Sequence, residues 1–83
     1  MILKVERQEQ IDDGKNGLTR IITEIYQGNN YRFDGKNALI GNDDVLLTNY
    51  DLPDEITGEK LIHYEILNAY LMNDEGKTIE RII

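Results

Sequence analysis

The fold class depends on residues 18–26, which read Leu18-Thr19-Arg20-Ile21-Ile22-Thr23-Glu24-Ile25-Tyr26. Their apolar positions recur at the three- and four-residue steps of an amphipathic helix. Five of the nine residues are β-branched, however, and β-branched side chains favour strands. The segment also continues through Gln27-Gly28-Asn29-Asn30 into a second β-rich run, Tyr31-Arg32-Phe33. We therefore expect a β-hairpin over residues 18–33, with a helix over 18–27 as the alternative.

Turn signals recur on both sides of this segment. Asp13-Gly14-Lys15-Asn16-Gly17-Leu18 and Asp34-Gly35-Lys36-Asn37-Ala38-Leu39 share five of six residues, and Glu75-Gly76-Lys77-Thr78 is a looser copy. Asp-Gly is a strong hairpin signal, because Gly, and less readily Asp or Asn, tolerates the positive φ of primed turns. We interpret these stretches as hairpin turns. Short intervals between turns are typical of an all-β barrel or sandwich.

The remaining segments also favour strands. Residues 2–11 predict a first strand, and 38–40 and 45–48 predict short ones. Near the C-terminus the apolar residues Ile62, Tyr64, Ile66, Tyr70 and Met72 alternate with a period of two, which predicts a strand, with a helix over 59–72 as the alternative. A turn at 73–76 and a closing strand over 77–83 follow. Pro53 predicts a surface loop over 51–58, with room for one helical turn.

The predicted fold is therefore all-β, or a β-rich α+β variant. We expect a small antiparallel meander that forms a barrel-like or sandwich-like sheet, with at most one or two short helices. Eighty-three residues predict a single domain over 1–83. A domain of this size buries only about 60–65% of the surface of its unfolded chain, which leaves little room for a deep cavity.

The composition predicts a cytoplasmic setting. The chain has no cysteine, whereas small secreted domains usually depend on disulfides. The N-terminal stretch becomes charged at Lys4, and no apolar run approaches the ~18 residues of a membrane span. We therefore expect neither a signal peptide nor a membrane contact.

Charge is distributed unevenly along the chain. Residues 1–42 hold six acids and six bases, whereas residues 43–75 hold nine acids and the single base Lys60. The net charge of −7 therefore comes from the second half. A field of one sign attracts partners of opposite sign and repels nucleic acid and anionic membranes, so we expect no direct nucleic-acid binding.

Motifs for catalysis and for cofactors are incomplete. Gly76-Lys77-Thr78 matches the end of a phosphate-binding loop, but Leu71 stands where its first glycine is required. Residues 12–23 resemble a calcium loop only at their start, because Gly14 and Thr23 occupy ligand positions. His63 is the only histidine, and the chain has no serine or cysteine nucleophile. We predict a protein that is not an enzyme and has no catalytic residue, cofactor or metal site.

The candidate binding surface is the segment from Asp43 to Glu59, which we call the acidic ridge. It contains six acids and no base over seventeen residues. Tyr50 and Leu52 lie within it, and apolar anchors of this kind are common at interface centres. The predicted partner-binding residues are Asp43, Asp44, Tyr50, Asp51, Leu52, Asp54, Glu55 and Glu59.

Two classes of function follow. The first is a non-enzymatic acidic protein-binding module that engages a basic protein surface. Small phage or mobile-element inhibitors of host nucleic-acid-binding or defence proteins, anti-CRISPR-like or DNA-mimic-like, have a similar size and charge. The alternative is a structural or assembly component, such as a phage particle subunit or a homodimer joined through an edge strand. Ile79, Ile82 and Ile83 favour the alternative, because an uncovered strand rich in isoleucine is a pairing edge.

Overall fold

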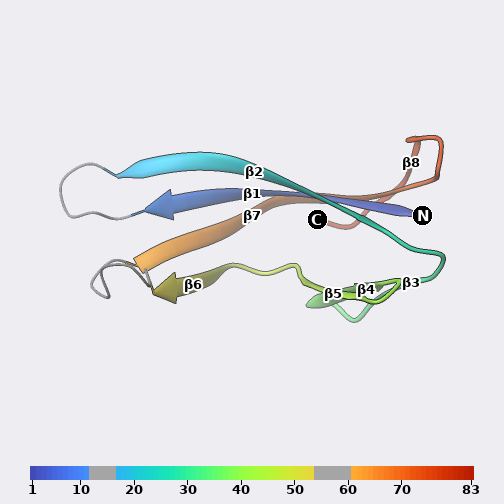
Figure 1. Ribbon diagram of the computed structural model, residues 1–83, viewed down its shortest axis with the longest axis horizontal. Helices are drawn as coiled ribbons and strands as arrows, with labels where there is room; N and C mark the ends of the chain where they lie inside the picture. The colour runs from blue at the N-terminus through green and yellow to red at the C-terminus, as the bar shows by residue number, and fades with distance from the viewer. Residues whose placement is uncertain (12–16, 54–60) are drawn as a thin grey trace.

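A computed structural model describes residues 1–11, 17–53 and 61–83, which form two antiparallel sheets (Figure 1). The five-stranded sheet has the order β2-β1-β7-β6, with β8 also paired to β7, and the three-stranded sheet has the order β3-β4-β5. No helix occurs among these residues, so the all-β prediction is confirmed and both helical alternatives are wrong. The strands are β1 (Ile2–Ile11), β2 (Leu18–Gln27), β3 (Tyr31–Phe33), β4 (Asn37–Ile40), β5 (Asp43–Leu46), β6 (Tyr50–Pro53), β7 (Leu61–Met72) and β8 (Thr78–Arg81).

Strand β1 is the centre of the larger sheet. It pairs with β2 from Ile2↔Gln27 to Ile11↔Leu18, and with β7 from Ile2↔Met72 to Ile11↔Ile62. The molecule is elongated, 43 × 20 × 20 Å, because these three long strands run side by side. The small sheet lies at the end of them that holds the N-terminus (Figure 1).

The expected hairpin over residues 18–33 is wrong in its pairing. Both halves are strands, but β2 pairs with β1, and β3 pairs with β4 in the other sheet. Gly28 lies at the crossing point, where its N–H donates to the carbonyl of Met1 (3.0 Å). A partner of ten residues offers β2 many more ladder hydrogen bonds than the three residues of β3 can offer. The 27–30 turn therefore transfers the chain between sheets.

A β-bulge in β7 breaks the expected period of two. The pairing shifts between Glu6↔Asn68 and Arg7↔Ile66, which leaves Leu67 as the extra residue. Directly paired residues share a face of the sheet, so Ala69 faces inward beside Val5, and Ile66 faces inward beside Arg7. Tyr70 and Met72 consequently face away from the small sheet, although the simple alternation placed them with Ile62, Tyr64 and Ile66.

The core lies between the two sheets at one end of the molecule. It consists of fully or nearly fully buried residues, Leu3, Val5, Ala38, Ile40, Val45, Leu47 and Ala69. Leu3 and Val5 lie on the same face of β1, and both are completely buried. Ile82 and Ile83 pack against this cluster, and both of their N–H groups donate to the carbonyl of Ala69. The end of the chain is thus tied to the core.

Two of the predicted turns are confirmed. Gly35 (φ 94°) turns β3 into β4, and Gly76 (φ 84°) turns β7 into β8. The Asp34 carboxylate accepts the N–H groups of Lys36 (2.8 Å) and Asn37 (2.6 Å), which lower the pKa of Asp34. The turn predicted at 13–18 falls largely on residues 12–16, outside the described residues.

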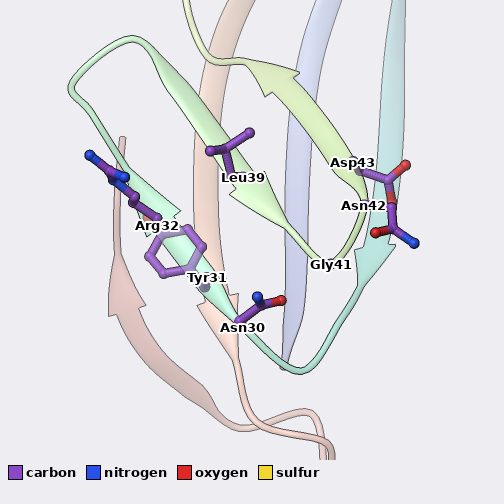
Figure 2. Close-up of a pocket in the computed structure, with 7 residues that line it drawn as sticks. All are labelled: Asn30, Tyr31, Arg32, Leu39, Gly41, Asn42 and Asp43. Atoms are coloured by element: carbon purple, nitrogen blue, oxygen red, sulfur yellow. The ribbon is translucent and has the colours of Figure 1, made fainter.

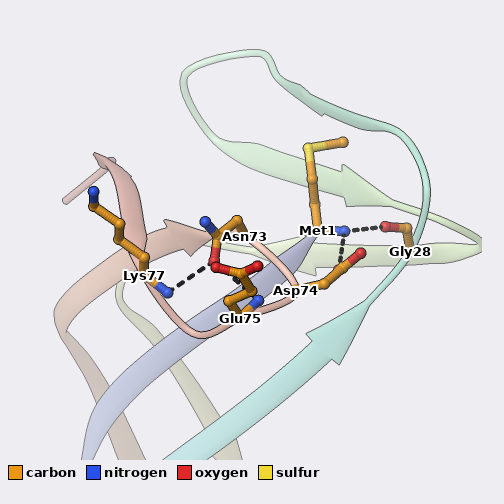
Figure 3. Close-up of polar contacts among 6 residues, drawn as sticks. All are labelled: Met1, Gly28, Asn73, Asp74, Glu75 and Lys77. Atoms are coloured by element: carbon orange, nitrogen blue, oxygen red, sulfur yellow. Dashed lines mark hydrogen bonds and ion pairs between the residues drawn. The ribbon is translucent and has the colours of Figure 1, made fainter.

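A polar network closes the N-terminal end of the large sheet (Figure 3). The Met1 ammonium donates to the Gly28 carbonyl (2.8 Å) and to the Asp74 carboxylate (2.9 Å). The Asn73 side chain accepts the N–H groups of Glu75 and Lys77, which holds the β7–β8 turn. The turn, the chain start and the end of β2 are therefore joined.

The Pro53 segment differs in part from the predicted loop. Tyr50–Pro53 forms β6, a short strand paired with β7, and Pro53 is its last residue. Proline is tolerated there because the position is at the end of an edge strand. The rest of the predicted loop, 54–58, lies outside the described residues.

Gly28 provides a test of the crossing between the sheets. A Cβ at Gly28 would lie 2.4 Å from the amide nitrogen and 2.7 Å from the Cα of Gly41, and backbone atoms cannot yield as a side-chain end can. We expect Gly28→Ala to lower the free energy of unfolding by about 2 kcal/mol or more. Gly17→Ala is the matched control, since nothing lies within 4 Å of its added Cβ. Urea denaturation measures both, and equal midpoints for the two variants would contradict the close approach.

Candidate functional site

The structure divides the acidic ridge between the two sheets. Asp43 and Asp44 begin β5 in the small sheet, and both are exposed. Tyr50, Asp51 and Leu52 lie on β6 in the large sheet. Asp54, Glu55 and Glu59 lie outside the described residues. The residues that can be placed thus form two groups on different sheets.

Asp43 borders a shallow hollow on the small sheet (Figure 2). The hollow measures about 370 Å³, and its lining also includes Tyr31, Arg32 and Leu39. Leu39 is 45% exposed, whereas its neighbours Ala38 and Ile40 are completely buried. The adjacent Asp44 carboxylate accepts a hydrogen bond from the Asn37 side chain (2.9 Å).

Asp51 faces His63 across the β6–β7 ladder. The Asp51 Oδ1 lies 2.5 Å from Nδ1 of His63, and both side chains are partly exposed. The two residues are direct partners in the ladder, which explains the contact. Within the described ranges, no three histidine or acidic residues gather as they would around a metal ion.

Tyr50, predicted as an apolar anchor, is held by other side chains. Its ring stacks on Tyr64 with centroids 4.9 Å apart, and the Arg7 guanidinium lies over it at 5.6 Å. Tyr50 is half-buried, whereas Leu52 is 46% exposed. Of the two predicted anchors, Leu52 is therefore the more accessible in the described structure.

A charged cluster lies on the inner face of the large sheet, where the small sheet ends. Arg7 is 3% exposed, and its Nε contacts the Glu24 carboxylate at 2.7 Å. The same guanidinium donates to the Leu46 carbonyl of the small sheet (2.5 Å). Glu9 is 7% exposed and binds both Arg20 (2.9 Å) and the Tyr64 hydroxyl (2.8 Å).

The ion pairs of the first half show which acids its bases bind. Arg7 and Arg20 pair with Glu24 and Glu9, and Lys4 lies 3.7 Å from Glu6, so each base pairs with an acid from residues 1–42. In the described part of the chain, no ion pair joins a lysine or arginine to a carboxylate of residues 43–75. Lys4, Arg7 and Arg20 therefore form no ion pair with the acids of the second half, whereas the Met1 ammonium pairs with Asp74 (2.9 Å).

Burial raises the pKa values of two tyrosines that border the charged cluster. Burial, together with the charge and hydrogen bond of Glu24, raises the pKa of Tyr26 to about 12. Burial also raises the pKa of Tyr64, with the hydrogen bond to Glu9 as the second cause. Both phenols stay protonated at neutral pH, which suits Tyr64 as a donor to Glu9.

Beyond the charged cluster, the inner face of the large sheet is open. Leu18, at the far end of β2, is 61% exposed, and the Arg20 side chain is 70% exposed. On the opposite face of β2, Ile21 and Ile25 are 55% and 59% exposed. Sequence reasoning missed this surface because the same isoleucines were assigned to a hairpin with residues 31–33, which would have covered one edge of β2. The apolar residues on both faces of 18–26 were the available signal.

Comparisons with models of known protein families, with curated proteins and with solved structures find no match to this chain. Among the residues that the structure describes, no helix is long and apolar enough to cross a membrane.

The Arg7–Glu24 pair can be tested by double substitution. We expect Arg7→Met to lower the free energy of unfolding by about 3 kcal/mol, because it leaves a partly buried carboxylate without its cation. The double variant Arg7→Met, Glu24→Leu should recover a substantial part of that loss, since no orphaned charge remains. Lys4→Met is the control, because its exposed pair contributes less than about 1 kcal/mol. Additive losses in the double variant, measured in urea, would argue against the coupling.

The raised pKa of Tyr26 predicts that the protein loses stability at alkaline pH. An unfolded tyrosine titrates near pH ~10, whereas the folded chain keeps the Tyr26 proton to about pH 12. Between these values the folded state binds more protons, so stability should be unaffected below pH 9 and should fall as the pH rises through this range. Tyr26→Phe should make the fall shallower. Urea midpoints between pH 8 and pH 11 give the comparison, and identical slopes in wild type and variant would refute it.

Proposed function

We propose that this chain is a non-enzymatic, acidic protein-binding module whose partner presents a basic surface. The observation that carries the proposal is the arrangement of ion pairs. The bases Lys4, Arg7 and Arg20 form ion pairs with acids of the first half, so they are not paired directly with the acids from Asp43 onward. A net negative field accelerates encounter with a cationic surface and orients it.

A groove that normally holds nucleic-acid phosphates is one such basic surface. Exposed carboxylates spaced along a compact domain can occupy the positions of phosphates on it. Asp43 and Asp44 on one sheet and Asp51 on the other present carboxylates at separate places, which suits an extended groove better than a single cationic pocket. An inhibitor of a host nucleic-acid-binding or defence protein is the specific form of this proposal, with a cytoplasmic site of action.

A second candidate function is assembly through an edge strand, and one observation favours it. Strand β2 pairs only on its β1 side among the described residues, and it carries the exposed Ile21 and Ile25. The C-terminal isoleucines are less suitable than the sequence indicated. Ile82 and Ile83 pack against the core, and β8 is only four residues long.

The acidic proposal predicts that removing acids of the ridge weakens partner binding by slowing association. Once a partner is captured from a lysate of cells that contain this protein and identified by mass spectrometry, surface plasmon resonance can measure the rates. We expect Asp43→Asn, Asp51→Asn to slow association several-fold at low salt with little effect on dissociation, because steering acts on the encounter. Wild-type association should also slow as salt rises.

The matched control is Glu75→Gln, Glu80→Gln, which removes the same charge from exposed positions outside the ridge. Equal losses in both double variants would show that net charge acts rather than the ridge. Rates that are unaffected by salt and by either variant would discard the acidic proposal.

A further inference from the structure

The open edge of β2 is the longest strand edge without a partner in the described residues. Its ten residues pair with β1 in an uninterrupted register and include neither a proline nor a lysine. Prolines, bulges and charged side chains usually protect an edge from pairing, and of these β2 has only Arg20 and Glu24, which are of opposite sign. Edge β2 therefore remains a template for another strand.

The hydrogen-bond pattern shows which groups of β2 point outward. Gly28 and Met1 exchange hydrogen bonds at 3.0 and 2.8 Å, so the backbone N–H and C=O groups of Gly28 point toward β1. The direction of the backbone groups alternates along an antiparallel strand, so those of Tyr26, Glu24, Ile22, Arg20 and Leu18 also point toward β1. The N–H and C=O groups of the residues between these point away from β1; these residues are Thr19, Ile21, Thr23, Ile25 and Gln27.

The side chains of β2 are self-complementary about Ile22. Arg20 and Glu24 lie two residues on either side of it, on the same face of the sheet. When two copies of such a strand pair antiparallel about a twofold axis at Ile22, each Arg20 lies opposite a Glu24. Opposite charges in direct cross-strand positions stabilise a sheet.

We propose that a second copy of this chain docks antiparallel along the edge of β2, with the twofold axis at Ile22. This inference specifies the occupant for the second candidate function above, and it does not depend on the acidic proposal. The two large sheets become one continuous sheet across the dimer.

The register follows from hydrogen bonding and charge together. The backbone N–H and C=O groups that point away from β1 belong to odd-numbered residues, so hydrogen bonds between two copies require odd-numbered residues to lie opposite odd-numbered ones. An axis at Ile22 satisfies this requirement, because it places Ile21 opposite Thr23 and Thr19 opposite Ile25. An axis at Ile21 or Thr23 also matches these groups, but it places Ile22 opposite Arg20 or Glu24. An axis at Arg20 or Glu24 places like charges opposite each other, which is destabilising.

The proposed register extends the charged cluster across the interface. Within one chain Arg7 already contacts Glu24, and Arg20 already contacts Glu9. Across the axis the row becomes Arg7, Glu24, the partner subunit's Arg20 and the partner subunit's Glu9, with signs that alternate throughout. The twofold axis generates a second, identical row.

The other face of the sheet supplies apolar contact. Ile21 of one copy lies diagonal to the partner subunit's Ile21 and Ile25, within reach of side chains across a strand pair. These isoleucines are more than half exposed in the single chain, so pairing removes apolar surface from water. Strand β2 has one acid and one base, so it meets its copy without the repulsion that the net charge of −7 implies elsewhere.

Cysteine scanning tests the register, because the chain has no cysteine of its own. Ile22→Cys places two thiols at the axis in a non-hydrogen-bonded pair, where a Cα separation of about 4.5 Å permits a disulfide. We expect this variant to form disulfide-linked dimers under mild oxidation at least about tenfold faster than Ile79→Cys, which reports random collision at an exposed isoleucine of β8. Faster crosslinking of Ile21→Cys or Thr23→Cys would overturn the register. Rates equal to that of Ile79→Cys throughout would overturn the pairing.

Sedimentation equilibrium of the full chain tests the dimer without a cysteine. Wild type should show a monomer–dimer equilibrium between about 1 μM and 1 mM, the range of modest interfaces. Ile21→Lys should weaken it at least about tenfold, since a lysine on an edge opposes pairing, whereas Ile79→Lys, at a residue of similar exposure, should not. A wild-type monomer at 1 mM, or equal effects of the two lysines, would overturn the proposal. Ile21→Lys leaves the ridge acids in place, so binding to a basic partner can be scored separately.

Discussion

Strand β1 is the constraint on which the rest of the structure depends. It is paired on both sides along its whole length, so its register determines where β2 and β7 lie. Its inward residues meet two environments. Leu3 and Val5 lie beneath the small sheet and are completely buried, whereas Arg7 and Glu9 lie where that cover ends. One strand thus sets both the core and the charged cluster.

The charged cluster has a structural task at that boundary. Arg7 joins the two sheets by binding Glu24 in one and the Leu46 carbonyl in the other. Burying a guanidinium is costly unless its donors are satisfied. Here the carboxylate and the carbonyl offset part of that cost, whereas Nη1 of Arg7 is buried without a hydrogen-bond partner in the described structure. A consequence is that Arg7 and Arg20 form their ion pairs with acids of the first half, whereas Arg32 lines the same hollow as Asp43.

The two proposed surfaces differ in physical character. In the proposals, the acids of β5 and β6 would act at a distance and respond to salt, whereas the edge of β2 would act through backbone hydrogen bonds and apolar contact. They lie on different strands, so the structure permits both to be used at once. A dimer joined through β2 would present two copies of the acidic residues, and paired copies bind a repeated target more strongly than one copy does.

The sequence by itself determined most of the strands and two of the turns, although β6 was predicted as a loop. β-branched runs such as 18–26 and Asp-Gly or Glu-Gly turns are local features, and local preference is sufficient to place them. The charge imbalance was also readable, since it is a property of composition. Tertiary structure alone decided that β2 pairs with β1 rather than β3, because strand pairing depends on long-range contacts. It also decided the Leu67 bulge, which reverses the faces of β7, and the ion pairs of Arg7 and Arg20, because side chains distant in sequence meet only after the register of β1 is set.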